Sequence, residues 1–211
     1  KSEDLSWWKY DNYFEKKLSY NNVDNLSCEF KEYFNEVNSR EFVLALEKKF
    51  NMTNIISDPS LLGGGLHKIH PGGKLHIHAD FNYHKVTGWK RKLNMITYLN
   101  LGWRKEYGGC TEFWDKEMKQ CVKKVEPIFN RSVVFCVDSD SYHGHPDPLK
   151  FPEGTSRMSL ASYYYVHHKN SMDTVSYRST DYKARPQDDK SEKIENLREK
   201  RRKGRLIDLK T

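Results

Sequence analysis

Hydrophobic residues follow two different rhythms along this chain of 211 residues. In the first part, up to about residue 58, apolar side chains recur every three or four positions, which is typical of amphipathic helices. The positions that carry this rhythm are Phe30, Phe34 and Val37, and then Phe42, Leu46 and Phe50. Asn38 followed by Glu41 three residues later resembles a capping box and predicts a helix start there. We therefore expect residues 1–58 to form a helical N-terminal support.

From about residue 60 the rhythm changes to short extended segments separated by glycine and proline. Gly63-Gly64-Gly65 and Pro71-Gly72-Gly73 are typical of turns and breaks between strands. The expected strands are 66–70, 74–80, 93–101, 111–114, 122–125, 132–137 and 157–166. Short strands at this spacing favour a β barrel or a double-sheet jelly roll, and we expect such a core over residues 59–170.

The last part of the chain, residues 171–211, is polar and basic. Within 191–203 only Ile194 and Leu197 are apolar, so the pattern predicts an exposed helix or a partly disordered tail. This extension is expected either to belong to the same single domain or to form a tail. Its basic cluster, 200–203 with Arg205, suggests a polyanion contact as an alternative to a solvated face. A contact with a polyanion such as nucleic acid is less favoured than a solvated face.

Composition narrows the class of protein only a little. The formal net charge is +7, which favours an anionic partner or co-substrate unless the basic extension accounts for it. No run of about 18 apolar residues suggests a membrane span. The four cysteines contain no Cys-x-x-Cys pair, which predicts reduced thiols in a cytoplasmic (intracellular) protein. Cys110 and Cys121 flank an apparent hairpin, so a disulfide between them is a weaker alternative.

The segment 75–80 carries the first candidate chemistry. His78 and Asp80 lie two residues apart, and on an extended strand such side chains point to the same side. With His143 they supply the two histidines and one carboxylate that bind Fe(II) and leave coordination positions open. His76 and His145 are rivals at the same spacing, so the residues alone leave the ligand choice open.

A second requirement of such a site is a group that binds a carboxylate. Arg157 opens the last expected strand of the core, and its guanidinium suits paired hydrogen bonds to a carboxylate. Ser159 shares its strand face and offers a hydroxyl, and Tyr98 could supply a phenol. Arg91 and Arg131 are candidates to meet an acidic part of a substrate.

The order of these motifs resembles that of the Fe(II)- and 2-oxoglutarate-dependent dioxygenases, most closely their prolyl 4-hydroxylase-like branch. The stretches that carry the resemblance are His70-Pro71-Gly72, His78-Ala79-Asp80, Ile96-Thr97-Tyr98-Leu99-Asn100, Tyr107-Gly108-Gly109-Cys110-Thr111-Glu112-Phe113, 127–135, Tyr142-His143-Gly144, Arg157-Met158-Ser159 and Tyr163-Tyr164-Tyr165. They cover about half of the chain.

The resemblance implies a double-stranded β-helix (jelly roll) with helices packed outside its larger sheet. It implies His78, Asp80 and His143 as the iron ligands, preferred over His76 and His145. It implies Fe(II), 2-oxoglutarate and O2 as cofactor and co-substrates, with ascorbate a candidate supporting reductant.

In the same pattern, Arg157 binds the distal carboxylate of 2-oxoglutarate, assisted by Tyr98 and Ser159. His70 stands where the family often has a tyrosine, which weakens its claim to a co-substrate role. The expected substrate is a prolyl residue, in a peptide or free. A sugar or another small molecule is the alternative, because fold and cofactor do not fix the substrate. A non-catalytic jelly roll that binds a polyanion through the basic extension is the alternative from another class.

Overall fold

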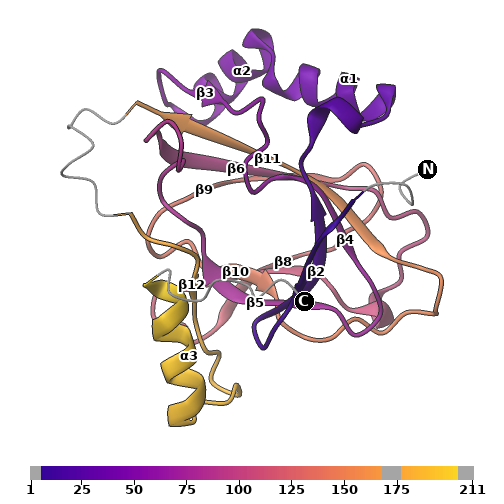
Figure 1. The fold of residues 1–211 in the computed structure, drawn as a ribbon, viewed down its shortest axis with the longest axis vertical. Coiled ribbons are helices and arrows are strands. Elements are labelled where there is room, and N and C mark those ends of the chain that lie inside the picture. The colour runs from indigo at the N-terminus through magenta and orange to yellow at the C-terminus, as the bar shows by residue number, and fades with distance from the viewer. Residues whose placement is uncertain (1–5, 168–176, 204–211) are drawn as a thin grey trace.

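Strands dominate the computed structural model, which describes residues 6–167 and 177–203 (Figure 1). Twelve of them join into one antiparallel sheet that curls around a central space. In chain order they are β1 Trp8–Asp11, β2 Glu15–Tyr20, β3 Ile56–Ser57, β4 Gly65–Ile69, β5 Lys74–Ala79, β6 Lys90–Tyr98, β7 Thr111–Trp114, β8 Cys121–Val125, β9 Ser132–Cys136, β10 His143–His145, β11 Arg157–Val166 and β12 Asp181–Tyr182.

The strands form two facing groups, as a double-stranded β-helix requires. β4, β11, β6 and β9 make the larger group, and β5, β10, β7 and β8 make the smaller one. β2 pairs with both β4 and β5 and so joins the two groups along one side. The expected fold class is confirmed. The predicted strands lie within about three residues of the observed ones, and 111–114 and 157–166 coincide with β7 and β11.

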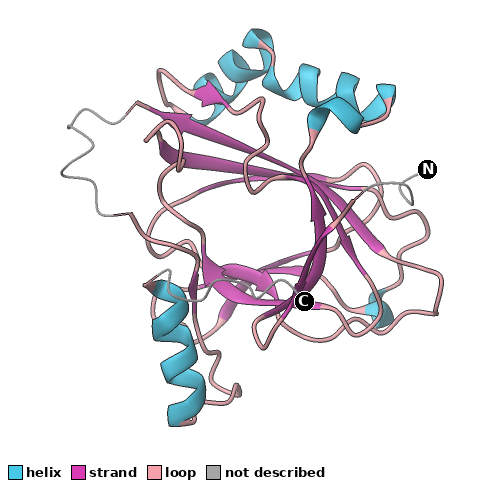
Figure 2. Cartoon of the chain, in the orientation of Figure 1, coloured by secondary structure: helices cyan, strands magenta, loops and turns pink. Residues whose placement is uncertain are grey.

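Two helices cover the outside of the larger group, as the N-terminal apolar rhythm predicts (Figure 2). α1 spans Cys28–Asn38 and α2 spans Arg40–Phe50. Their buried residues share one core with side chains of β4, β6 and β11. The Tyr164 hydroxyl of β11 donates to the Val37 carbonyl at 2.8 Å, which ties the sheet to α1.

The helix cap differs from the prediction by one residue. Asn38 remains in α1, and Ser39 caps α2 by accepting a hydrogen bond from the Phe42 amide at 3.2 Å. Ser39 is extended (φ −63°, ψ 156°) and also ends α1, so one residue serves both helices. An N-cap needs this non-helical conformation, which Asn38 does not have.

The helical expectation is wrong for residues 8–20. Trp8–Asp11 and Glu15–Tyr20 form a β hairpin, with Asp11 opposite Lys16. The Asn12 side chain accepts from the amides of Phe14 and Glu15 and so builds the turn. The dense aromatics of this segment therefore pack on and beside the sheet.

The C-terminal extension folds back onto the smaller group of strands. α3 spans Glu192–Arg202, and Ile194 packs with Phe14 and Tyr182. The helix is thus partly buried, beyond what its thin apolar content predicts. Arg205 of the basic cluster lies outside the described residues.

The structure also tests two expectations from composition. No helix among the described residues is long and apolar enough to cross a membrane. Cys28, Cys110, Cys121 and Cys136 are all free thiols, so the disulfide alternative is wrong.

Candidate metal centre and co-substrate chamber

His78, Asp80 and His143 meet inside the curled sheet. His78 lies near the end of β5, Asp80 follows that strand, and His143 begins β10 directly opposite His78. One donor atom from each residue lies within 4.8 Å of the other two. His78 Nε2 is 3.5 Å from Asp80 Oδ1, and His143 Nε2 is 3.4 Å from Asp80 Oδ2. All three side chains are buried, so the cluster is shielded from bulk water.

The backbone fixes the orientation of both imidazoles. His78 Nδ1 lies 2.9 Å from the His76 carbonyl oxygen, and His143 Nδ1 lies 3.0 Å from the Ser141 carbonyl oxygen. Because a carbonyl only accepts, each Nδ1 carries the proton and each Nε2 keeps a lone pair that faces Asp80. This is the arrangement of metal-binding histidines. Two imidazole nitrogens and one carboxylate oxygen therefore fit a divalent iron.

Charged and polar neighbours keep Asp80 ionised. Asn94 Nδ2 donates to Asp80 Oδ2 at 2.6 Å, and a guanidinium nitrogen of Arg91 lies 3.4 Å from the same oxygen. Burial alone would raise the pKa of Asp80, but Arg91, His143 and His78 together hold it well below its usual range. Burial lowers the pKa of His143 to about 4, which leaves that ring neutral near pH 7. Arg91 is thus engaged at the centre, and the prediction that it meets substrate is wrong.

A small chamber of about 100 Å³ extends from this cluster to Arg157. Arg157 is 3% exposed and starts β11. Its Nε donates to the Gly109 carbonyl at 2.9 Å, and one terminal nitrogen donates to Thr111 Oγ1 at 3.1 Å. Within residues 6–167 and 177–203 no carboxylate pairs with it. The chamber therefore contains a buried cation whose hydrogen-bond partners are all neutral.

Comparison with known proteins agrees with this geometry. Residues 64–165 match the family model of the 2OG-Fe(II) oxygenase superfamily. The chain belongs to the 2OG-Fe(II) oxygenase superfamily. Enzymes of this superfamily use Fe(II), 2-oxoglutarate and O2, so the protein is a dioxygenase. No curated protein sequence matches it significantly.

Solved structures show the shared fold of this oxygenase. A prolyl-4-hydroxylase from Pseudomonas putida superimposes with a TM-score of 0.51 at 17% identity, over 77% of this chain and 79% of the other. A prolyl hydroxylase from Trichoplax adhaerens, solved with a hypoxia inducible factor peptide fragment, gives 0.51 at 20% identity, over 74% and 66%. At these sequence identities, the similarity shows a shared fold and nothing more.

Tyr98 and Ser159 take different places around Arg157. Ser159 lines the chamber. Tyr98 is fully buried and does not line it, but its hydroxyl donates to Thr111 Oγ1 at 2.7 Å. The Arg157 guanidinium carbon lies 5.2 Å from the centre of the Tyr98 ring. Tyr98 therefore positions Thr111 and Arg157, and Thr111 is a chamber residue that the sequence motifs do not single out.

A β-bulge separates the two histidines of β5. His143 lies opposite His78, but His145 lies opposite Leu75, so β5 contains one extra residue between these pairs. Such an insertion reverses which face the following side chains take. Leu75 and His78 line the chamber, whereas His76 contacts the rings of Tyr13 and Phe14. His76 therefore does not share the metal-facing side, as a regular strand would require.

His145, the less preferred of the two histidines on β10, also lies in the chamber. It is 4% exposed, and neither ring nitrogen has a hydrogen-bond partner. Burial, with the positive charge of Arg157, holds the pKa of His145 well below its ordinary value. Its ring is thus a neutral donor and acceptor beside the buried guanidinium. The His-x-His spacing on β10 is the signal in the sequence that points to it.

Two further basic residues of the oxygenase reach the chamber, and His70 does not. His67 on β4 and Lys17 on β2 both line it. Burial, with the charges of Lys17 and Arg157, lowers the pKa of His67 to about 3. His70 is exposed beyond the end of β4, which contradicts the co-substrate role considered for it. Residues 67 and 70 differ by three positions, so a strand that turns His67 inward does not turn His70 the same way.

Lys17 is held by an acid that also binds the C-terminal helix. Its Nζ lies 3.1 Å from Glu15 Oε2, and Arg201 of α3 donates to Glu15 Oε1 at 2.9 Å. Glu15 is 2% exposed, so this three-residue link is largely shielded from solvent. The extension is thereby connected to a side chain of the chamber.

Proposed function

We propose that His78, Asp80 and His143 hold Fe(II), and that Arg157 with Thr111 binds the distal carboxylate of 2-oxoglutarate. On this assignment the oxygenase hydroxylates a C–H bond of a prolyl residue. The observation that carries the proposal is the buried Arg157, which has no carboxylate partner among residues 6–167 and 177–203 and lies in the same chamber as the His-Asp-His cluster.

An unpaired buried cation is expensive to maintain. Removing an ion from water costs several kcal/mol even after relaxation, and a protein compensates for it with a paired anion. Among the described residues, the hydrogen-bond partners of Arg157 are neutral groups, which include the Gly109 carbonyl and the Thr111 hydroxyl. A dicarboxylate with one end on the metal and the other on Arg157 supplies the missing charge. Ser159 and His145 add neutral groups along its path.

The protein's own residues hold geometry and exclude water. Nε2 of His78 and Nε2 of His143 would offer lone pairs to the metal, and ionised Asp80 would cancel one of its two positive charges. Apolar side chains of Leu75, Ile96 and Ala161 line the chamber and limit water near the centre. When bound, Fe(II) with 2-oxoglutarate and O2 supplies the oxidation of a C–H bond, with succinate and CO2 as co-products.

The prolyl substrate is the leading choice, and the two structural relatives named above are prolyl hydroxylases. A sugar or another small molecule is the second choice, because the same centre oxidises any C–H bond placed beside it. The non-catalytic polyanion module is disfavoured by pairing within the basic cluster. Arg201 binds Glu15, and Arg202 and Lys203 both bind Glu199.

The first test is spectroscopic and needs no substrate. Anaerobic addition of Fe(II) and 2-oxoglutarate to the wild-type protein should produce a visible charge-transfer band. Arg157→Ala should raise the 2-oxoglutarate concentration needed for half of the band by about 30-fold or more, with unchanged iron content, because a buried charge-assisted contact contributes about 2–5 kcal/mol. Arg131→Ala, which removes an arginine paired with Glu126 near the surface, is the matched control and should change nothing.

The outcomes separate the parts of the proposal. A wild-type protein without the band would refute the centre. If Arg157→Ala and Arg157→Lys weaken iron and 2-oxoglutarate equally, Arg157 is structural. Succinate release with proline peptides, free proline and sugars then decides the substrate class.

A further inference from the structure

A second cavity of about 430 Å³ lies beside the chamber. The two share Gly63 and Phe81 in their walls, so the second cavity adjoins the entrance to the candidate centre. We call it the outer pocket. Its size lies within the range of about 300–1,000 Å³ that is typical of ligand sites. The inner chamber, of about 100 Å³, leaves most of a larger substrate to be placed outside it.

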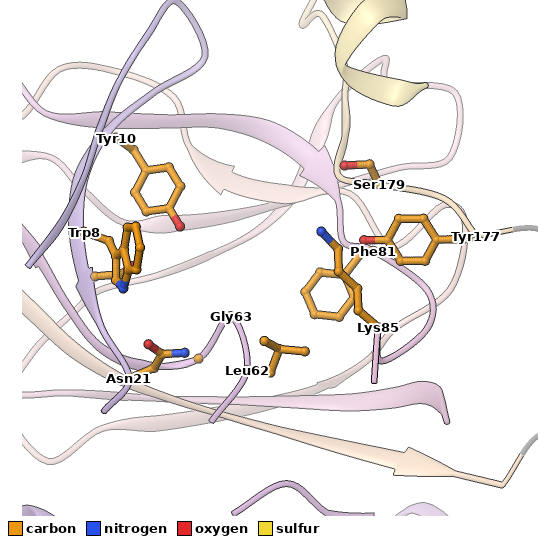
Figure 3. A pocket seen from close by; sticks show the side chains of 11 residues that line it. Trp8, Tyr10, Asn21, Leu62, Gly63, Phe81, Lys85, Tyr177 and Ser179 are labelled. Carbon is orange, nitrogen blue, oxygen red and sulfur yellow. The ribbon is translucent and has the colours of Figure 1, made fainter. Parts of the chain in front are cut away.

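Aromatic rings line the outer pocket on two opposite sides (Figure 3). Trp8 and Tyr10 of β1 stand on one side, and Phe81 and Tyr177 stand on the other. Trp8 is 55% exposed and Tyr177 is 42% exposed. Among the described residues, the remaining exposed aromatic side chain is Phe129, so two of the three exposed rings lie at this pocket. Rings of this kind bind extended, proline-containing chains through their flat faces.

One cation stands among these rings, and no acidic partner for it lies within the described residues. Lys85 lines the pocket with its Nζ 5.7 Å from the centre of the Tyr177 ring. The other lysines nearby are paired, Lys9 with Asp11 and Lys17 with Glu15. In the part of the chain that the structure describes, no Asp or Glu pairs with Lys85, and none lines the outer pocket. The pocket therefore has a positive potential that favours an anionic group.

We infer that the outer pocket binds a peptide segment of the substrate that carries an acidic side chain, with Lys85 as the residue that recognises its charge. This inference rests on the proposed function and narrows it to a peptidyl substrate with Asp or Glu close to the oxidised residue. The aromatic walls hold the chain. A free amino acid would fill only a small part of the two adjoining cavities.

The test measures binding rather than turnover. Blocked heptapeptides of Gly and Ala with one central Pro carry Glu, Gln or Lys two positions before or after it. Their affinity for the protein with Fe(II) and 2-oxoglutarate is measured by calorimetry without dioxygen. The Glu peptide of at least one series should bind about twofold to fivefold tighter than its Gln counterpart, as expected for one exposed ion pair, and the Lys peptide should bind weakest.

Two variants test the assignment of the residue. Lys85→Gln should abolish the difference between Glu and Gln peptides and leave the affinity of the Gln peptide unchanged. Lys123→Gln, an exposed lysine of β8 with the same change of charge, should keep the difference. Trp8→Ala should weaken all peptides alike, since the ring contributes contact area and no charge.

Equal affinities for Glu and Gln peptides in the wild type would overturn the inference, as would a preference that survives Lys85→Gln. Binding of a hexose phosphate without any acidic peptide would also overturn it. Each of these results leaves the proposed function standing if the charge-transfer band with 2-oxoglutarate is present in the same sample. Loss of that band in the wild type counts against the proposed function instead.

Discussion

β5 and β10 each carry two histidines spaced two residues apart. On each strand, the two histidines have opposite surroundings. His78 and His143 each have Nδ1 held by a backbone carbonyl, and their Nε2 atoms face one carboxylate. Among the described residues, His145 has no hydrogen-bond partner on either ring nitrogen and lies inside the chamber, whereas His76 has none on Nδ1 and lies outside the chamber against aromatic rings. Residue type and spacing are the same in both pairs. An imidazole whose Nδ1 is held by a backbone carbonyl is fixed in orientation, with Nε2 directed at the proposed metal position. An imidazole without that partner is open to another contact.

The largest difference is expected when each of the two histidines of β10 is replaced in turn. His143→Ala removes one of the three proposed ligands and should lower the affinity for Fe(II) by about 100-fold or more, beyond the range seen for supporting residues. His145→Ala should leave the iron content within about twofold, because its nitrogens do not face Asp80. Metal analysis after dialysis gives both values. Equal iron loss in the two variants would show that His145 is also a ligand.

The support of Asp80 should come next. Asn94→Ala removes the 2.6 Å hydrogen bond to Asp80 Oδ2 and should weaken Fe(II) binding by about 10-fold to 100-fold. Titration with Fe(II) under argon measures it. Asn100→Ala, which removes a buried amide bonded to the Pro127 carbonyl instead, serves as the control for general loss of stability. An unchanged iron affinity in Asn94→Ala would mean that Arg91 alone orients the carboxylate.

Gly144 maintains the bulge that separates His76 from His78. A Cβ at this position would lie 2.7 Å from the Leu75 carbonyl oxygen and 2.8 Å from that of His76. Gly144→Ala should therefore lower the free energy of unfolding by about 2 kcal/mol, measured by urea denaturation. Gly154→Ala has open space around it and a φ of +80°, so it isolates the cost of backbone strain. An unchanged free energy of unfolding in Gly144→Ala would show that crowding at the bulge has no effect.

The smallest effect should separate His145, which lines the chamber, from His76, which does not. His145→Phe should weaken 2-oxoglutarate by about threefold to tenfold, the worth of one hydrogen bond, and leave iron binding intact. His76→Phe should change both by less than twofold, since His76 does not line the chamber. The 2-oxoglutarate dependence of the charge-transfer band gives the affinity. Full recovery in His145→Gln but not in His145→Phe would identify a hydrogen bond, whereas wild-type affinity in His145→Phe would refute one.

Much of the fold and of the candidate centre can be predicted from local patterns. Alternation and turn residues predict β7 and β11 at their observed bounds. The helix α1 is predicted by the spacing of Phe30, Phe34 and Val37. The hairpin of β1 and β2 is missed because dense aromatics suit a helix as well as a sheet, and its strand identity depends on pairing with β4 and β5. The burial of the basic extension is underestimated for a similar reason, because Arg201 forms an ion pair with Glu15, a residue near the other end of the chain.

The sequence by itself determines which ligands could be assembled, and the order of the motifs around them. Residue types and spacings make His78, Asp80, His143 and Arg157 candidates, and the resemblance carried by the order of the motifs prefers His78 and His143 over His76 and His145. Only the tertiary structure decides which of the four histidines on β5 and β10 face the metal position. One extra residue in β5 reverses the faces of the strand, and that register is set by pairing between segments about 65 positions apart, where local spacing carries no information.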